Sequence, residues 1–142
     1  EKSKKTCWAI AQSPPPTPQG RLEKYLWRNE KQNKSFVVKP DSKDAKHAVL
    51  SYKTIAQSER YTLLEINLET GRHHQIRCQL SAIGSPIKGD LKYGAKRSNP
   101  DGGISLHARK IEFIHPVSKV SISIIAPVPD DTLWRELELN CK

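Results

Sequence analysis

Cysteine is scarce in this chain, and its three cysteines do not match the pattern of a metal site or a disulfide framework. Cys7, Cys78 and Cys141 lie far apart, and none belongs to a CxxC pair. Such sites need paired cysteines at short or regular spacing. The adjacent His73 and His74 would point in different directions on a helix and could not readily share an ion. We therefore expect no metal, free thiols and a reducing, cytoplasmic location.

Apolar residues are also few, since 36% of the chain is hydrophobic and 6% is aromatic. No run approaches the roughly 20 apolar residues that a membrane-spanning helix needs. We expect neither a membrane partner nor a signal peptide. A chain of 142 residues can still bury a core, so we predict one domain, or part of one, over residues 1–142.

Positive charge is what the chain has in excess. It carries 24 Lys and Arg against 15 Asp and Glu, a net charge of +9. A solvated basic surface would explain this balance, but clustered cations favour a polyanionic partner, because phosphate binding releases counterions. The cations gather in the second half of the sequence, at Lys88, Lys92, Lys96, Arg97, Arg109, Lys110 and Lys119. The charge therefore favours a nucleic acid as partner.

A strand followed by a short helix forms the centre of the predicted structure. Residues 61–69 alternate apolar and polar side chains, which is typical of a half-buried strand. Thr70 and Gly71 interrupt it. The apolar residues after His73 recur at helical spacing, at Ile76, Leu80 and Ile83, so we predict a short helix there. Gly84 and Pro86 end it.

The rest of the pattern predicts an α+β fold with a mainly antiparallel, mixed sheet and a few short helices. Prolines predict a rigid loop over 12–20. Asp131 is a candidate N-cap for a last helix. We also predict a helix of one or two turns over 21–28, because Leu22, Tyr25 and Leu26 have helical spacing. Further strands are expected at residues 5–11, 36–38, 48–55, 104–114 and 120–126.

Arg77 has an informative position on the central helix. If Ile76 and Leu80 face the core, Arg77 lies on the flank, close to the edge of the core. A cation at a buried edge needs an anionic partner. That partner could be a carboxylate in a structural ion pair, a catalytic carboxylate or a phosphate. The pattern alone leaves these alternatives open.

Four blocks of sequence together resemble the carboxyl-terminal half of the catalytic domain of the RluA-type RNA pseudouridine synthases. They are Thr70–Arg77, Gly84–Gly94, Ser105–Phe113 and His115-Pro116, and they occur in the order of that family. The resemblance implies an enzyme of RNA modification that converts uridine into pseudouridine in ribosomal or transfer RNA. It implies RNA as partner and no cofactor or metal.

The resemblance also implies roles for individual residues. Arg77 matches the arginine that pairs with the catalytic aspartate of the family. Arg72, His74 and Gln75 belong to the same block and would border the RNA cleft. His107 matches a later block, where it either contacts substrate or ties a strand to a helix. Three cations that follow the helix are expected to bind RNA phosphates, namely Lys88, Lys92 and Arg97.

The chain departs from the family in two places. The His-Arg-Leu-Asp type motif that holds the nucleophilic aspartate is absent, and Asp90 belongs to a different block, with an expected structural role. Where the family usually has a tyrosine, this sequence has Cys7, unless Trp8 takes that place. A thiol has no ring for stacking on a uracil.

These departures lead to three expectations. The chain is a partial domain that has no synthase activity alone, because the nucleophile is missing. The alternative is a non-catalytic RNA-binding module that keeps the cleft without the chemistry. If a missing amino-terminal half completes the sheet, an apolar sheet edge is exposed and invites that half, or a second copy, to pair with it.

Overall fold

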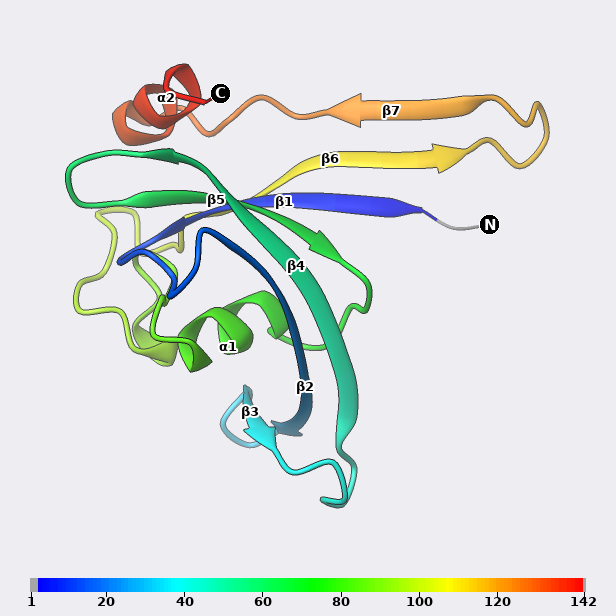
Figure 1. Cartoon of the computed structure of the whole chain (residues 1–142), viewed down its shortest axis with the longest axis vertical. Coiled ribbons are helices and arrows are strands. Elements are labelled where there is room, and N and C mark those ends of the chain that lie inside the picture. The colour runs from blue at the N-terminus through cyan, green and yellow to red at the C-terminus, as the bar shows by residue number, and fades with distance from the viewer. Residues whose placement is uncertain (1–2, 142) are drawn as a thin grey trace.

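One sheet of seven strands dominates the computed structural model, which describes residues 3–141 (Figure 1). The strand order is β3-β2-β4-β5-β1-β6-β7, and all neighbouring strands are antiparallel. The predicted α+β class is confirmed. The elements are β1 (Lys4–Ala11), β2 (Gln19–Asn29), β3 (Lys34–Val38), β4 (Lys46–Gln57), β5 (Thr62–Leu68), α1 (Gln75–Ala82), the 3₁₀ turn η1 (Leu91–Tyr93), β6 (Leu106–Ile114), β7 (Ser121–Ile125) and α2 (Thr132–Leu139).

Several predicted elements are confirmed. β4 pairs with β5 across a short turn, and β6 pairs with β7, as the alternating patterns indicated. The short central helix is α1. The carboxylate of Asp131 caps α2, since its Oδ2 accepts a hydrogen bond from the backbone N–H of Trp134 at 3.2 Å.

The helix predicted over 21–28 is wrong, because these residues lie in β2. A spacing of four residues also places two side chains on one face of a strand, so Leu22 and Leu26 fit both structures. β2 pairs with β3 on one side and β4 on the other. These two ladders of hydrogen bonds decide in favour of the strand. The proline-rich loop is also shorter than predicted, ending at Pro18, because Gln19 already pairs with Lys53.

Hydrophobic clusters cover both faces of the sheet. Along β1, Ala9 faces the cluster that includes Ile76 and Leu80 of α1. The neighbouring Trp8 faces the opposite cluster, with Trp134 of α2. Figure 1 shows α1 and α2 on opposite sides of the strands. This alternation places α1, the helix of the predicted site, on one face of the central strands.

β6 and β7 extend from the body as a hairpin (Figure 1). Within residues 3–141 no strand pairs with the outer edge of β7. The hairpin carries several large exposed apolar side chains, namely Ile114, Val117, Val120, Ile124 and Ile125. A free edge with such side chains can pair with another chain.

Two further absences concern the described part of the chain. None of its helices is long and apolar enough to cross a membrane. Residues 3–141 bring no three His, Cys, Asp or Glu side chains together in a group that could hold a metal ion. Cys7, Cys78 and Cys141 are free.

Candidate functional site

Arg77 is held by a carboxylate of the chain itself. Its Nε donates to Oδ2 of Asp90 at 2.9 Å, and its Nη2 donates to Oδ1 at 2.8 Å. The Asp90 side chain is 0% exposed and that of Arg77 is 20% exposed. The pair has the two parallel bonds that the planar guanidinium favours. Asp90 is thus an anionic partner of Arg77 within this chain, and the bonds to Asp90 raise the pKa of Arg77.

His74 accepts a hydrogen bond from Arg77. Nη1 of Arg77 lies 3.1 Å from Nε2 of His74, and arginine can only donate. The imidazole proton therefore lies on Nδ1, which donates to the Tyr93 hydroxyl at 2.8 Å. Burial, and then the charge of Arg77, lower the pKa of His74 to about 4. His74 is thus neutral at neutral pH, because a proton on Nε2 would face a second donor.

Tyr93 connects the site to the edge of the sheet. Its hydroxyl accepts the backbone N–H of Ser35 at 2.8 Å, and the Arg77 guanidinium lies 5.0 Å from the centroid of its ring. Burial raises the pKa of Tyr93. The Ser35 hydroxyl donates to the carbonyl oxygen of His73 at 2.8 Å. Asp90, His74 and Tyr93 therefore fix one orientation of the arginine, and the backbone of β3 holds Tyr93.

Sequence reasoning missed Tyr93 and Ser35. Ser35 precedes Tyr93 by 58 residues, and no periodicity in the sequence joins them. The strand pairing that brings β3 beside α1 is a tertiary feature. The one local signal was Tyr93 itself, within the block from Gly84 to Gly94.

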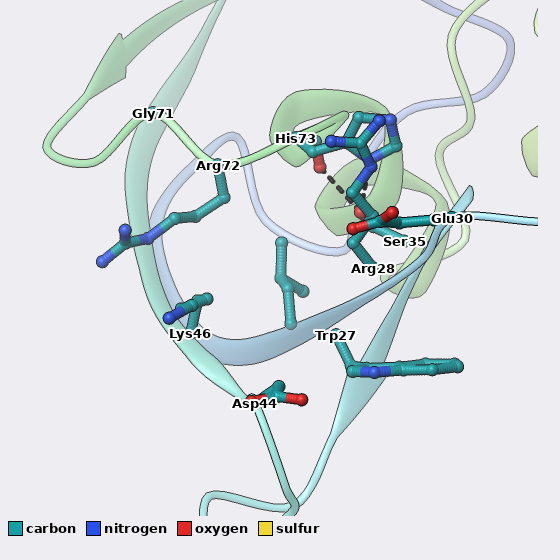
Figure 2. Close-up of a pocket in the computed structure, with 10 residues that line it drawn as sticks. Trp27, Arg28, Glu30, Ser35, Asp44, Lys46, Gly71, Arg72 and His73 are labelled. Atoms are coloured by element: carbon teal, nitrogen blue, oxygen red, sulfur yellow. Dashed lines mark hydrogen bonds between the residues drawn. The ribbon is translucent and has the colours of Figure 1, made fainter. Parts of the chain in front are cut away.

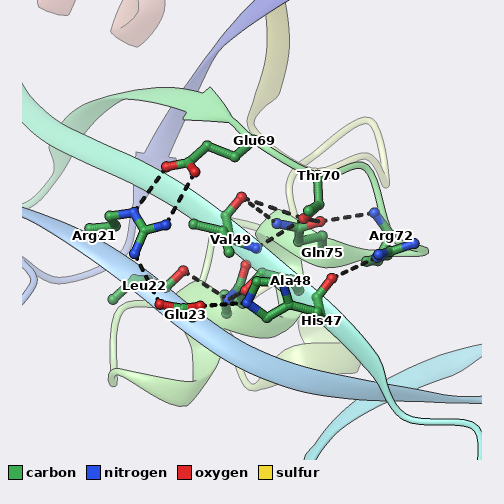
Figure 3. A network of polar contacts seen from close by, with 11 residues as sticks. Arg21, Leu22, Glu23, His47, Ala48, Val49, Glu69, Thr70, Arg72 and Gln75 are labelled. Carbon is green, nitrogen blue, oxygen red and sulfur yellow. Dashed lines mark hydrogen bonds and ion pairs between the residues drawn. The ribbon is translucent and has the colours of Figure 1, made fainter.

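Gln75 is part of the scaffold. It is 3% exposed, its Oε1 accepts from the Thr70 hydroxyl at 2.8 Å and from the Arg72 backbone at 2.9 Å, and its Nε2 donates to the carbonyl of Val49 at 3.1 Å (Figure 3). These bonds hold the break between β5 and α1 in place. The structure therefore buries Gln75 beneath the surface that it was expected to border.

Arg72 lines a hollow of about 450 Å³ between β2, β4 and the start of α1. Its Nε donates to the carbonyl of His47 at 2.7 Å. We call this the mixed-charge hollow, since cations and carboxylates both line it (Figure 2). Its charged and aromatic lining consists of Trp27, Arg28, Glu30, Asp44, Lys46, Arg72 and His73.

The other predicted site residues lie in three separate places. Lys92 donates to the backbone carbonyls of Gln32 and Asn33, at 3.1 and 3.0 Å, on the turn between β2 and β3. His107 lies on β6, where its Nε2 donates to the carbonyl of Ala126 at 3.2 Å and its ring meets Trp134 edge-on. His107 thus links β6 to the segment before α2 through these contacts.

Lys88 and Arg97 meet in a second hollow, of about 660 Å³, on the side of α1 where the helix ends. We call this the basic hollow. The cations that line it are Arg60, Lys88, Lys96 and Arg97. The predicted phosphate-binding cations are therefore divided, because Lys92 lies outside this hollow.

Cys7, and not Trp8, lies on the face of the sheet that carries α1. Cys7 packs against the cluster of Ile76 and Leu80. Trp8 lies on the opposite face, with the guanidinium of Arg109 4.2 Å from its ring centroid. Burial raises the pKa of Cys7, so the thiol remains protonated.

Comparison with known proteins identifies the family. The sequence profile described as RNA pseudouridylate synthase matches residues 1–82. The chain is 36% identical over 112 residues to the uncharacterized RNA pseudouridine synthase YlyB of Bacillus subtilis, covering 79% of this chain. It is 32% identical over 134 residues to the ribosomal large subunit pseudouridine synthase D of Vibrio cholerae, covering 85% of this chain.

Solved structures agree on the fold. Human RNA pseudouridylate synthase domain containing 4 superposes with a TM-score of 0.73 at 22% identity, covering 90% of this chain and 59% of that chain. Human RNA pseudouridylate synthase domain containing 1 gives a TM-score of 0.71 at 19% identity, covering 89% and 55%. The chain belongs to the RNA pseudouridylate synthase family. It spans 36% of the Bacillus subtilis relative and 40% of the Vibrio cholerae relative.

Proposed function

We propose that this chain forms the arginine-bearing part of an RNA uridine isomerase and binds its RNA through the basic surface beside α1. The observation that carries the proposal is the fixed Arg77 guanidinium. It is bound on one side by the buried Asp90, and it occupies the position that the family resemblance assigns to the catalytic arginine. Ribosomal or transfer RNA is the proposed substrate, and the cytoplasm is the proposed location.

Arg77 keeps donors available for a second anion. A guanidinium has five N–H groups. Two of them donate to Asp90 and one to His74, and within residues 3–141 the others have no partner. A carboxylate placed against them would stay ionised and oriented, because a close positive charge lowers its pKa. Arg77 would thus hold the nucleophile in its reactive form.

The proposed reaction is an isomerisation. The bond from the ribose C1′ to uracil N1 breaks, and a bond from C1′ to C5 forms; C5 loses a proton and N1 gains one. A carboxylate nucleophile would hold the ribose while the base turns. The His-Arg-Leu-Asp type motif for that nucleophile is absent from this sequence, so we expect the chain alone to form no pseudouridine.

A second candidate function is RNA binding without catalysis. Cys7 favours it, because Cys7 packs on the α1 face where the family resemblance places a tyrosine. A protonated thiol cannot stack on a uracil, and it is a poor proton acceptor. In this case Arg77 and Asp90 would only maintain the shape of the cleft.

Pseudouridine measurement separates the two candidates. The chain and the complete product of the gene that encodes it would each be incubated with total RNA, and pseudouridine would be quantified by mass spectrometry of nucleosides. We expect RNA binding by both and pseudouridine only with the complete product. If the complete product binds RNA and leaves every uridine unchanged, the non-catalytic function is correct.

A further inference from the structure

The basic hollow has a strongly one-sided charge. It lies between the turn that joins β4 to β5, the end of β1 and the loop after α1. None of its lining residues, all within the described part of the chain, is acidic. The groups that matter for its chemistry are Arg60, Tyr61, Lys88, Lys96, Arg97 and Asn99.

A tight loop fixes the floor of this hollow. Gly89 has φ +88°, and a Cβ there would lie 2.6 Å from Nδ2 of Asn99 and 2.7 Å from the carbonyl oxygen of Gly103. Asn99 accepts a hydrogen bond from Nζ of Lys88 at 2.7 Å and donates to the Ser105 hydroxyl at 3.1 Å. Only glycine fits at position 89. The position of Lys88 is therefore set before any ligand arrives.

The remaining cations are brought in by other segments. The backbone N–H of Lys96 donates to Oε1 of Gln12 at 2.7 Å, which ties the loop to the end of β1. Arg60 enters from the turn before β5. Within residues 3–141, the charged groups of Arg60, Lys96 and Arg97 have no hydrogen-bond or ion-pair partner.

Ion pairs between arginines and carboxylates are common elsewhere on the molecule. Arg21 pairs with Glu69, and Arg109 pairs with Glu138. Converging cations repel one another, so an anion between them is favoured.

The positive region also has a clear boundary. Beyond Lys88 and Asn99, an adjoining hollow is lined by the acidic residues Asp101, Asp130 and Asp131.

We infer that the basic hollow binds phosphodiester groups of the RNA backbone through Arg60, Lys96 and Arg97, with Lys88 at its floor. This inference rests on the proposed function and adds the position of a backbone site. The hollow favours the charged phosphates over the bases of RNA. Its one aromatic ring, Tyr61, is half-buried, and the ammonium of Lys88 already lies 5.6 Å from the ring centroid. It offers no free ring for base stacking.

The test measures RNA affinity and its dependence on salt. Fluorescence anisotropy with a labelled single-stranded RNA of 20 nucleotides would compare the chain with the variant Arg60→Gln/Lys96→Gln/Arg97→Gln. We expect about a tenfold loss of affinity near 0.1 M salt and a slope of log K against log salt that is shallower by about 2, since each single-strand phosphate contact contributes about 0.7. The three side chains are exposed, so we expect the variant to keep the fold.

A matched variant controls for net charge. Lys4→Gln/Lys24→Gln/Lys39→Gln removes the same charge from exposed positions away from the hollow, and we expect its affinity within about twofold of the unchanged chain. Equal losses in both triple variants would overturn the site. An unchanged affinity in the variant Arg60→Gln/Lys96→Gln/Arg97→Gln would also overturn the site. In both cases, RNA binding by the unchanged chain would leave the proposed function standing. No RNA binding by any form would overturn both.

Free phosphate is the other source of the same chemistry. Potassium phosphate and potassium chloride would be added to the RNA complex at equal ionic strength. A backbone site predicts equal displacement of RNA by the two salts. Displacement by millimolar phosphate well beyond that by chloride would show a site for a single phosphate and would overturn the assignment to the RNA backbone.

Discussion

The two hollows beside α1 contain similar cations but differ in how their charge is balanced. In the mixed-charge hollow, Arg72 and its neighbours share the lining with Glu30 and Asp44. In the basic hollow, no acidic residue lines the wall. Carboxylates lie among the cations of the first hollow, whereas the cations of the second favour an anion from outside. We therefore expect the carboxylates near the cations, more than the number of cations, to decide where RNA binds.

The Arg77–Asp90 ion pair connects the two hollows. His74, which accepts from Arg77, stacks on His73 of the mixed-charge hollow with ring centroids 3.8 Å apart. Asp90 directly follows Gly89 of the basic hollow. A change at this pair should therefore affect both hollows together.

The largest expected effect is that of Asp90→Asn. It leaves the guanidinium of Arg77 without its buried partner, and loss of one member of such a pair costs about 3 kcal/mol of unfolding free energy. Urea denaturation measures this. The exposed carboxylate of Asp41 provides a control, since Asp41→Asn should change stability by less than about 0.5 kcal/mol. Equal stability of Asp90→Asn and Asp41→Asn would show that the Arg77–Asp90 ion pair does not stabilise the fold.

The pH dependence of stability comes next in size. The pKa of His74 is lowered to about 4 in the folded chain, below its ordinary value in the unfolded chain, so the unfolded chain binds the proton more readily. The contribution of neutral His74 is complete above about pH 6.5 and is lost as the pH falls towards 4.

We expect this loss to be about 1 kcal/mol after allowance for solvent screening. Thermal melts between pH 7 and 4 would compare the chain with His74→Asn, a residue that accepts the left-handed backbone at this position, φ 51°. The difference between the two should shrink as the pH falls. A difference that stays constant would mean that His74 does not titrate in this range.

Removing the carboxylates of the mixed-charge hollow tests whether they cause the expected difference in RNA binding between the two hollows. Glu30→Gln/Asp44→Asn leaves Arg28, Lys46 and Arg72 as the charged lining of this hollow, and we expect RNA affinity to rise about threefold at low salt. Anisotropy measures the change. Asp41→Asn/Glu136→Gln alters net charge equally at exposed sites and should have a smaller effect. An equal rise in both would mean that only net charge matters.

The smallest effect concerns neither hollow. The exposed apolar edge of β7 predicts weak self-association, and Ile124→Lys should abolish it. Sedimentation velocity at several concentrations would detect the change. RNA affinity should stay within about twofold, since the hairpin contributes nothing to either hollow. A chain that is monomeric at all concentrations would remove self-association from consideration.

Sequence patterns predicted the local parts of this structure and missed the contacts made at long range. The β4–β5 hairpin, α1 and the Asp131 cap follow from periodicity and capping within a few residues. The strand β2 was missed because a spacing of four residues fits a strand and a helix equally well.

The candidate site shows the same division. The position of Arg77 on the flank of α1 correctly indicated that it needs an anion. The identity of that anion, Asp90, depends on how the loop after α1 folds back. Likewise, Arg60 was not predicted beside Arg97, because only the packing of the β4–β5 turn against the later loop brings them together.

The central claim is that Arg77 serves the chemistry and the basic hollow serves binding. Single-turnover pseudouridine formation at saturating RNA, measured with the complete gene product, tests it most directly. Arg77→Lys should lower the rate by about 100-fold, because lysine cannot keep the forked geometry. The variant Arg60→Gln/Lys96→Gln/Arg97→Gln should reach the unchanged rate once RNA is saturating. A normal rate in Arg77→Lys, or a lost rate in the triple variant at saturation, would contradict the account.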